Sequence, residues 1–112
     1  MRLEKEYRYI YGIWQYVEMI LDELGASTEK IGEFGSESGK LVKNYESKLN
    51  DAIIIVEVTY EKKHVPVISN SFGKIAFTSV KIDVNANSSE REKEILDYFL
   101  KRLNLYTLRS AG

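Results

Sequence analysis

The chain has 112 residues, of which 44% are hydrophobic and 29% are charged, with a formal net charge of -1 at pH 7. These proportions are typical of a globular domain and exclude an intrinsically disordered chain. The near-zero charge provides no overall positive field, so nucleic acid is disfavoured as a partner, and the absence of cysteine excludes disulfides and Cys-ligated metals.

No apolar run approaches the roughly 20 residues that a membrane helix needs, and the acidic residues near the N-terminus are unlike a signal peptide. We therefore expect a single compact domain over residues 1–112, located in the cytoplasm without membrane contact. Lys and Glu together make up 24 residues, whereas Gln, His and Pro occur once each. This bias is typical of thermophilic proteins, although six asparagines weaken the interpretation.

The first predicted element is a long amphipathic helix from Leu3 to Leu24. Its apolar residues recur at alternating spacings of four and three, which forms one stripe along a helix: Leu3, Tyr7, Ile10, Trp14, Val17, Leu21 and Leu24. Gly25 follows, where a left-handed C-cap is expected. A second stripe, formed by Tyr9, Ile13, Tyr16 and Ile20, runs beside the first. The helix is therefore expected to touch two surfaces.

Residues 26–40 are rich in glycine and serine, and we interpret them as a loop with room for one short strand around Lys30 to Phe34. The stretch GEFGSESGK at 32–40 differs from a phosphate-binding G-x-x-x-x-G-K-[ST] loop, because its glycine spacing is wrong and Leu41 follows Lys40. A helix beginning at Gly39 would still offer free N–H groups to an anion.

Residues 40–50 fit two structures. Leu41, Tyr45 and Leu49 stand four apart, which favours a short helix. A strand would instead place Lys43 on the same face as these apolar residues, which is a poorer pattern. We therefore expect a helix here.

Three strands are predicted next. AIIIVEVTY (52–60) is apolar on both faces in its first half and alternates in its second, so we expect cover on both faces at one end and on one face at the other. HVPVIS predicts a short strand with Pro66 at an edge or bulge, and NSFG predicts a tight turn. KIAFTSVKIDV (74–84) predicts a strand with a bulge near Thr78–Ser79.

The last predicted element is a helix that begins with Ser89 and Glu92 in a capping-box pattern. Its apolar face is formed by Ile95, Leu96, Phe99 and Leu103. The expected fold class is α+β: a long N-terminal helix, a three-stranded or four-stranded, mostly antiparallel sheet and a C-terminal helix, with the helices packed on one face.

No pattern in the sequence predicts a catalytic site. His64 is the only histidine, and Glu57 and Glu61 would stand about 13 Å apart on a strand, so a metal site formed by these residues is disfavoured. No G-x-S-x-G elbow occurs. We expect no enzyme activity, no catalytic residue, no metal and no cofactor.

The leading hypothesis is therefore a non-catalytic domain that acts through protein–protein association, as a homodimer or with another protein. Its interface residues would be Tyr9, Ile13, Tyr16 and Ile20, unless the C-terminal helix covers them within the chain. The alternative is a small carrier that binds an apolar ligand between helices and sheet, lined by Tyr60, Phe77, Trp14 and Phe99. A weaker hypothesis is nucleic-acid contact through Lys62, Lys63, His64 and Lys74.

Overall fold

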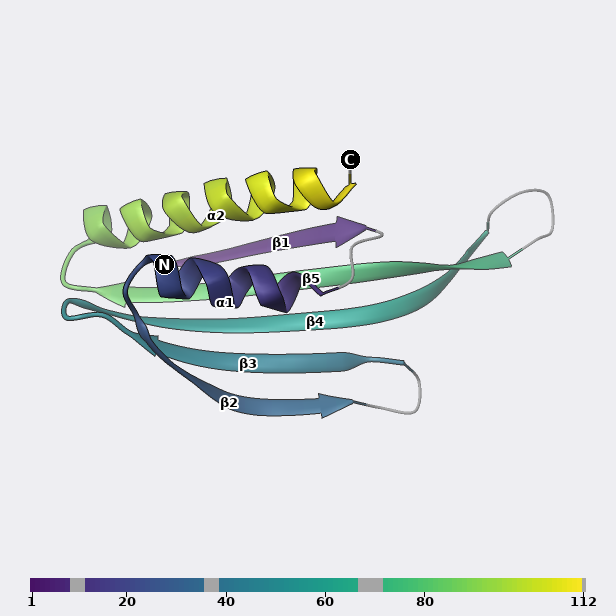
Figure 1. The fold of residues 1–112 in the computed structure, drawn as a ribbon, viewed down its shortest axis with the longest axis horizontal. Helices are drawn as coiled ribbons and strands as arrows, with labels where there is room; N and C mark the ends of the chain where they lie inside the picture. The colour runs from purple at the N-terminus through teal and green to yellow at the C-terminus, as the bar shows by residue number, and fades with distance from the viewer. Residues whose placement is uncertain (9–11, 36–38, 67–71, 112) are drawn as a thin grey trace.

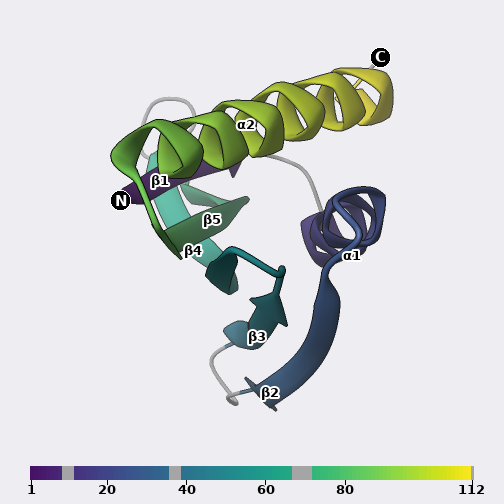
Figure 2. The ribbon, with the colours of Figure 1, turned by 90° about the vertical axis from the view of Figure 1, so that its left-hand side faces the viewer.

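The computed structural model describes residues 1–8, 12–35, 39–66 and 72–111. Five antiparallel strands form one sheet in the spatial order β1-β5-β4-β3-β2, and both helices lie on the same side of it (Figure 1 and Figure 2). The elements are β1 (Arg2–Arg8), α1 (Ile13–Glu23), β2 (Ser27–Gly35), β3 (Leu41–Lys48), β4 (Ala52–Pro66), β5 (Phe72–Ala86) and α2 (Ser89–Ala111). The sheet therefore has more strands than predicted, and the N-terminal helix is short.

The predicted helix from Leu3 to Leu24 is wrong over its first six residues, up to Arg8, which form part of β1 along the edge of β5. A spacing of four residues, such as that between Leu3 and Tyr7, keeps two side chains on one face of a strand as well as of a helix. Gly12 then adopts φ 83°, a left-handed conformation that interrupts a right-handed helix. Of the described residues in the predicted range, the 11 residues of α1 are helical, and Gly25 lies just beyond them at φ 75° as expected.

The predicted helix at residues 40–50 is also wrong, because Leu41–Lys48 form β3 between β4 and β2. The four-residue spacing of the apolar side chains is again compatible with both structures. Lys43 does occupy the helix-covered face, and its ammonium lies 4.3 Å from the ring centroid of Trp14. This cation–π contact stabilises the Lys43 charge on the inward face of the strand, where apolar side chains are usual.

Strand β2 spans nine residues, more than the short strand expected within the predicted loop. Its register against β3 shifts between Lys30 and Gly32. Ile31 lies at this irregularity with 53% of its surface exposed. The extra residue of a bulge leaves the hydrogen-bond ladder, which explains how an isoleucine comes to be exposed here.

The strands predicted at 52–60 and 74–84 are confirmed, and each is longer than expected. Their register runs without a break from Ala52 opposite Ala86 to Pro66 opposite Phe72, so the predicted bulge near Thr78–Ser79 is wrong. The predicted HVPVIS strand begins as a continuation of β4. Of the predicted NSFG turn, residues 70 and 71 lie outside the described residues, and the other two begin β5.

Beyond Tyr60 and Phe77, β4 and β5 continue as a two-stranded ribbon, because β3 and β1 pair with them only up to these residues (Figure 1). Pro66 pairs with β5 alone, at a position where its missing N–H costs no second ladder bond. The expected edge position of this proline is confirmed.

Helix α2 begins at Ser89, but its cap lies one residue earlier than predicted. The Ser88 hydroxyl accepts a 3.2 Å hydrogen bond from the Arg91 N–H, which satisfies a free donor of the first turn. The Glu92 carboxylate instead accepts a 3.4 Å hydrogen bond from the Ala86 N–H, so it links the helix to the end of β5. The described part of neither helix is long and apolar enough to cross a bilayer.

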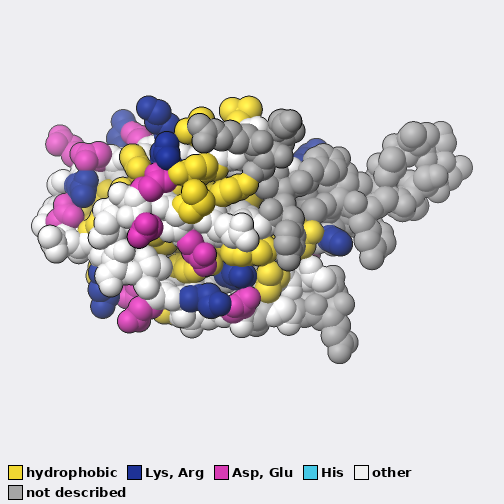
Figure 3. Space-filling model, viewed as in Figure 1, with side chains coloured by type: hydrophobic (Ala, Val, Ile, Leu, Met, Phe, Trp, Pro, Cys, Tyr) yellow, Lys and Arg dark blue, Asp and Glu magenta, His cyan; other side chains and the backbone are white. Residues whose placement is uncertain are grey.

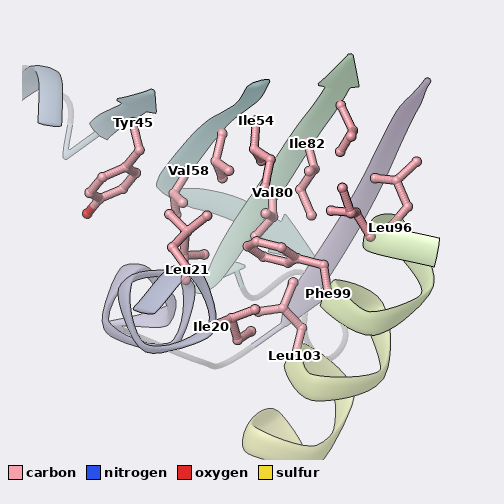
Figure 4. Close-up of a cluster of buried hydrophobic side chains, with 14 of the residues drawn as sticks. Ile20, Leu21, Tyr45, Ile54, Val58, Val80, Ile82, Leu96, Phe99 and Leu103 are labelled. Atoms are coloured by element: carbon pink, nitrogen blue, oxygen red, sulfur yellow. The ribbon is translucent and has the colours of Figure 1, made fainter. Parts of the chain in front are cut away.

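The core lies between the two helices and the face of the sheet that they cover (Figure 4). Buried side chains alternate with exposed ones along β4 and β5, which gives each strand one inward face. The predicted apolar face of α2 is confirmed, since its four residues are at most 6% exposed. The inward side chains are Ile54, Val56 and Val58 of β4, Val80, Ile82 and Val84 of β5, Ile20 and Leu21 of α1, and Phe99 and Leu103 of α2.

The turn before α1 provides a test of this fold. A Cβ added at Gly12 would meet no atom within 4 Å, so the cost of Gly12→Ala comes from its left-handed backbone alone. We expect the free energy of unfolding to fall by about 1 kcal/mol in urea titrations. The control is Gly35→Ala, whose Cβ would meet the Lys40 carbonyl oxygen at an ordinary 3.7 Å, with an expected change within about 0.5 kcal/mol. Equal effects at both positions would contradict this account.

Candidate protein-interaction surface

The predicted interface residues of the N-terminal segment lie at different depths. Ile13 and Ile20 have no exposed surface and belong to the chain's own core. Tyr16 is half-buried on the side of α1 that faces α2, and Tyr9 lies outside the described residues. In this conformation a partner can contact Tyr16 but not the two isoleucines. The second stripe is thus covered largely within the chain, next to the C-terminal helix.

Exposed apolar and aromatic side chains gather where α1 and α2 run side by side (Figure 3). We call this group the tyrosine surface: Tyr16 and Met19 of α1, and Tyr98, Leu105 and Tyr106 of α2. Met19 is 47% exposed, Tyr98 36% and Leu105 37%. Tyr16 and Met19 are three residues apart, and Leu105 and Tyr106 follow Tyr98 by seven and eight residues, so each set lies on one side of its helix.

The rings of Tyr16 and Tyr106 stack with their centroids 5.5 Å apart and an interplanar angle of 19°. This contact joins α1 to α2 at the centre of the tyrosine surface. Offset-stacked rings contribute roughly 0.5–1.5 kcal/mol beyond the area that they bury. The two helices therefore present one continuous surface.

A charged pair, Glu23 and Arg102, lies within the tyrosine surface and joins the helices a second time. The Arg102 Nε donates to Glu23 Oε2 at 2.9 Å, and its Nη2 donates to Oε1 at 3.2 Å. Tyr98 donates from its hydroxyl to Oε2 at 3.2 Å, and the Tyr106 hydroxyl donates to Oε1. Both carboxylate oxygens thus accept hydrogen bonds from the opposite helix, in the two-point geometry that makes Arg–carboxylate pairs strong.

This arrangement changes the acidity of Glu23. The hydrogen bond from Tyr106 makes the largest contribution, and Arg102 and Tyr98 add to it, so the pKa of Glu23 lies below its ordinary value despite some desolvation. The carboxylate is therefore held ionised and fixed in orientation. Sequence patterns did not identify this pair because its two members stand 79 residues apart.

A second feature lies on the other flank of α1, facing β2 and β3. A cleft of about 390 Å³ is lined by Glu18, Asp22, Ala26, Thr28, Lys30 and Tyr45. The Tyr45 hydroxyl donates to Glu18 Oε1 at 2.8 Å, and burial is the largest reason that the pKa of Tyr45 is raised. Carboxylates, hydroxyls and a lysine dominate the lining, whereas carriers of apolar ligands use mostly apolar walls.

The residues expected to line an apolar carrier site are not brought together. Phe99 is fully buried in the core. Tyr60 pairs with Thr78, the residue next to Phe77, so Tyr60 and Phe77 lie on opposite faces of the sheet. Trp14 packs instead over the Lys43 ammonium on α1's side of the sheet. These positions favour core packing over a shared cavity.

The backbone places the remaining sequence candidates differently, and those considered for nucleic acid share the β4–β5 ribbon: Lys62, Lys63, His64 and Lys74. Gly39 is followed by β3, so the helix N-terminus considered for an anion does not form there. Glu57 and Glu61 stand opposite Lys81 and Phe77, while His64 stands opposite Lys74 in the ribbon. Within the described residues, no three His, Asp or Glu side chains converge as a metal-binding group.

The Glu23 pair predicts a specific pH dependence of stability. Because its folded pKa is lowered, the stability it contributes is present above its unfolded pKa of about 4.3 and is lost as the pH falls through the folded pKa. We expect Glu23→Gln to lower the free energy of unfolding by about 0.5–1 kcal/mol near pH 7, because the group is partly exposed. That difference should disappear in chemical denaturation at the acidic end. Glu6→Gln, at an exposed position on β1, is the control for the loss of one carboxylate charge.

Comparisons with known proteins identify no family for this chain. No family model and no curated protein matches it. Among solved structures, TTHA0849 from Thermus thermophilus aligns over 100% of both chains at 9% identity with a TM-score of 0.34. Ara h 8.0201 aligns over 97% of this chain and 98% of its own at 12% identity and a TM-score of 0.25. An uncharacterised protein from Rhizobium leguminosarum covers 97% and 99% at 11% identity and a TM-score of 0.22.

Proposed function

We propose that this chain is a non-catalytic domain that acts through protein–protein association, and that the tyrosine surface is its contact with other protein chains. The observation that carries this proposal is the gathering of exposed tyrosine, methionine and leucine side chains around a charged pair whose carboxylate already accepts hydrogen bonds at both oxygens. Both the exposed side chains and the hydrogen-bonded carboxylate are features of this chain alone, so the proposal does not require one particular partner.

The composition of the tyrosine surface supports this function. Tyr, Met and Arg are enriched in the centres of protein interfaces, and Tyr and Arg are frequent among the residues that dominate binding energy. A tyrosine offers a large apolar ring with a polar tip and loses little conformational freedom on binding. Here the rings of Tyr16 and Tyr106 are already stacked, so these two side chains lose less conformational entropy when a partner binds.

The charged pair supports the same proposal. A partner that covers Glu23 and Arg102 removes water from both, and such desolvation is costly when a charged group is left without hydrogen bonds. In this chain both oxygens of Glu23 already accept hydrogen bonds from α2. The surface can therefore be covered by an apolar partner surface without creating an unpaired carboxylate.

Site-specific photocrosslinking tests this function whatever the identity of the partner. We expect p-benzoylphenylalanine in place of Met19 to give a discrete adduct when irradiated in the native host cell, because that position lies within the contact. The same amino acid in place of Ile31, which is exposed on β2, is the control and should give none. An adduct of twice the chain's 12.9 kDa identifies a second copy, and any other discrete mass identifies another protein.

A surface variant links the adduct to the tyrosine surface. Leu105→Glu combined with the crosslinker at position 19 should reduce the adduct about tenfold, because it places a charge in the desolvated contact. Leu105 is exposed, so the variant's free energy of unfolding should stay within about 0.5 kcal/mol of the parent. No adduct above the control at position 19, or an adduct indifferent to Leu105→Glu, would contradict the proposed function.

A further inference from the structure

The face of the sheet opposite the helices carries an apolar patch formed by Ile53 and Ile55. Ile53 and Ile55 point to this outer face from β4, between inward residues of the same strand, and are 43% and 46% exposed. Strand β4 is the third of five in the sheet, so both isoleucines lie midway across the face, near the end of the sheet where β4 begins. Exposed β-branched residues at the centre of a sheet are typical of a surface that another layer covers.

The sequence carries the same information independently. The run AIII is apolar at consecutive positions, which predicts a strand covered on both faces at this end. The helices cover only one face, where Ile54 is fully buried. The second cover expected from the sequence is not supplied by the described residues of this chain.

Charged residues flank the two isoleucines unequally. On the neighbouring strands, Lys48 and Asn85 stand opposite Ile53, whereas Glu46 and Asp83 stand opposite Ile55. Asp83 is already within 3.8 Å of both Arg2 and the N-terminal ammonium, so the difference between the two ends lies on β3, with Lys48 beside Ile53 and Glu46 beside Ile55. Consider a two-fold axis that lies in the plane of the interface, between the isoleucines and perpendicular to β4. Rotation about it places Lys48 of one copy over Glu46 of the other.

The surface beside the isoleucines is hollowed. One hollow of about 500 Å³ borders both Ile53 and Ile55, and another of about 350 Å³ lies between Ile55 and Arg2 on β1. Each is large enough to receive aliphatic side chains from a facing sheet. Two sheets that pack face to face interdigitate their side chains in this manner, at a spacing of about 10 Å.

We propose that a second copy of this chain covers the outer face, in a two-fold symmetric dimer packed sheet on sheet around β4. In this dimer Ile53 of each copy contacts Ile55 of the other, and Lys48 of each copy lies near Glu46 of the other. The helices lie outside the paired sheets, so both tyrosine surfaces stay accessible. The dimer is thus independent of the proposed function, and either can fail without the other.

The charge of the outer face favours a second copy over a strongly charged partner. Around the isoleucines stand three basic residues and three acidic ones: Arg2, Lys48, Lys81, Glu46, Glu57 and Asp83. Their charges sum to zero, so a nucleic acid or an anionic membrane gains no net attraction here. The unequal arrangement of these charges around Ile53 and Ile55 matches the same surface turned by two-fold symmetry.

Sedimentation velocity at about 100 μM, followed by dilution, tests the dimer. We expect the wild type to sediment as a dimer, and Ile53→Thr with Ile55→Thr to raise the dissociation constant at least a hundredfold while preserving the β-branched character of the strand. Ile31→Thr is the matched control, since Ile31 is an exposed isoleucine on β2, and it should leave the dimer intact. A monomeric wild type, or a dimer unaffected by the double substitution, overturns the proposal.

A charge exchange tests the symmetry directly. Lys48→Glu alone and Glu46→Lys alone should each weaken self-association about tenfold, because each places like charges across the two-fold axis. Mixing the two variants should restore the wild-type dissociation constant, since both cross-axis contacts are then between opposite charges. Circular dichroism first establishes that each variant is folded, so failure of the mixture of folded variants to restore the dimer rules out this arrangement.

Discussion

The pairing of β4 with β5 is the constraint on which the rest of the structure depends. Fifteen residues of each strand are hydrogen-bonded in one unbroken register. Because side chains alternate between faces, this single register determines which residues of both strands face the helices. A slip of one residue would expose Ile54 and Val56 and bury Glu57, so the burial of the core and the register support each other.

The other elements are added to this pair in ways that differ chemically. Helix α2 buries aromatic and aliphatic side chains on β5 and β4, whereas the outer flank of α1 meets β3 through polar contacts. Lys43 lies under Trp14, and Tyr45 donates to Glu18 from a ring that is 1% exposed. Hydrogen-bonded polar groups tolerate burial at this flank, while the centre of the sheet is packed mostly with apolar side chains.

The sequence predicted β4, β5 and α2 because each has a long apolar pattern that fits one period. It misassigned β1 and β3 because apolar residues four apart satisfy both a helix and a strand, and the available signal against a helix was Gly12. On the candidate surface, Tyr16 was expected as a contact residue, but the tyrosines of α2 were not. Tyr98 and Tyr106 become neighbours of α1 only through tertiary packing, which places residues about 80 positions apart on one surface. No local spacing encodes such a contact, so this part of the surface required the three-dimensional structure.

The position of β1 also has a consequence for how the chain folds. Arg2 pairs with Asp83, and the Tyr7 hydroxyl donates to Asn104 on α2 at 3.2 Å. The ribosome therefore makes β1 long before any of its ladder partners, which all lie in β5. Contacts between such distant segments close large loops and slow the search for the native state. During synthesis, β1 has no ladder partner until β5 has been made. Its many charged residues favour the solubility of this unpaired segment in the meantime.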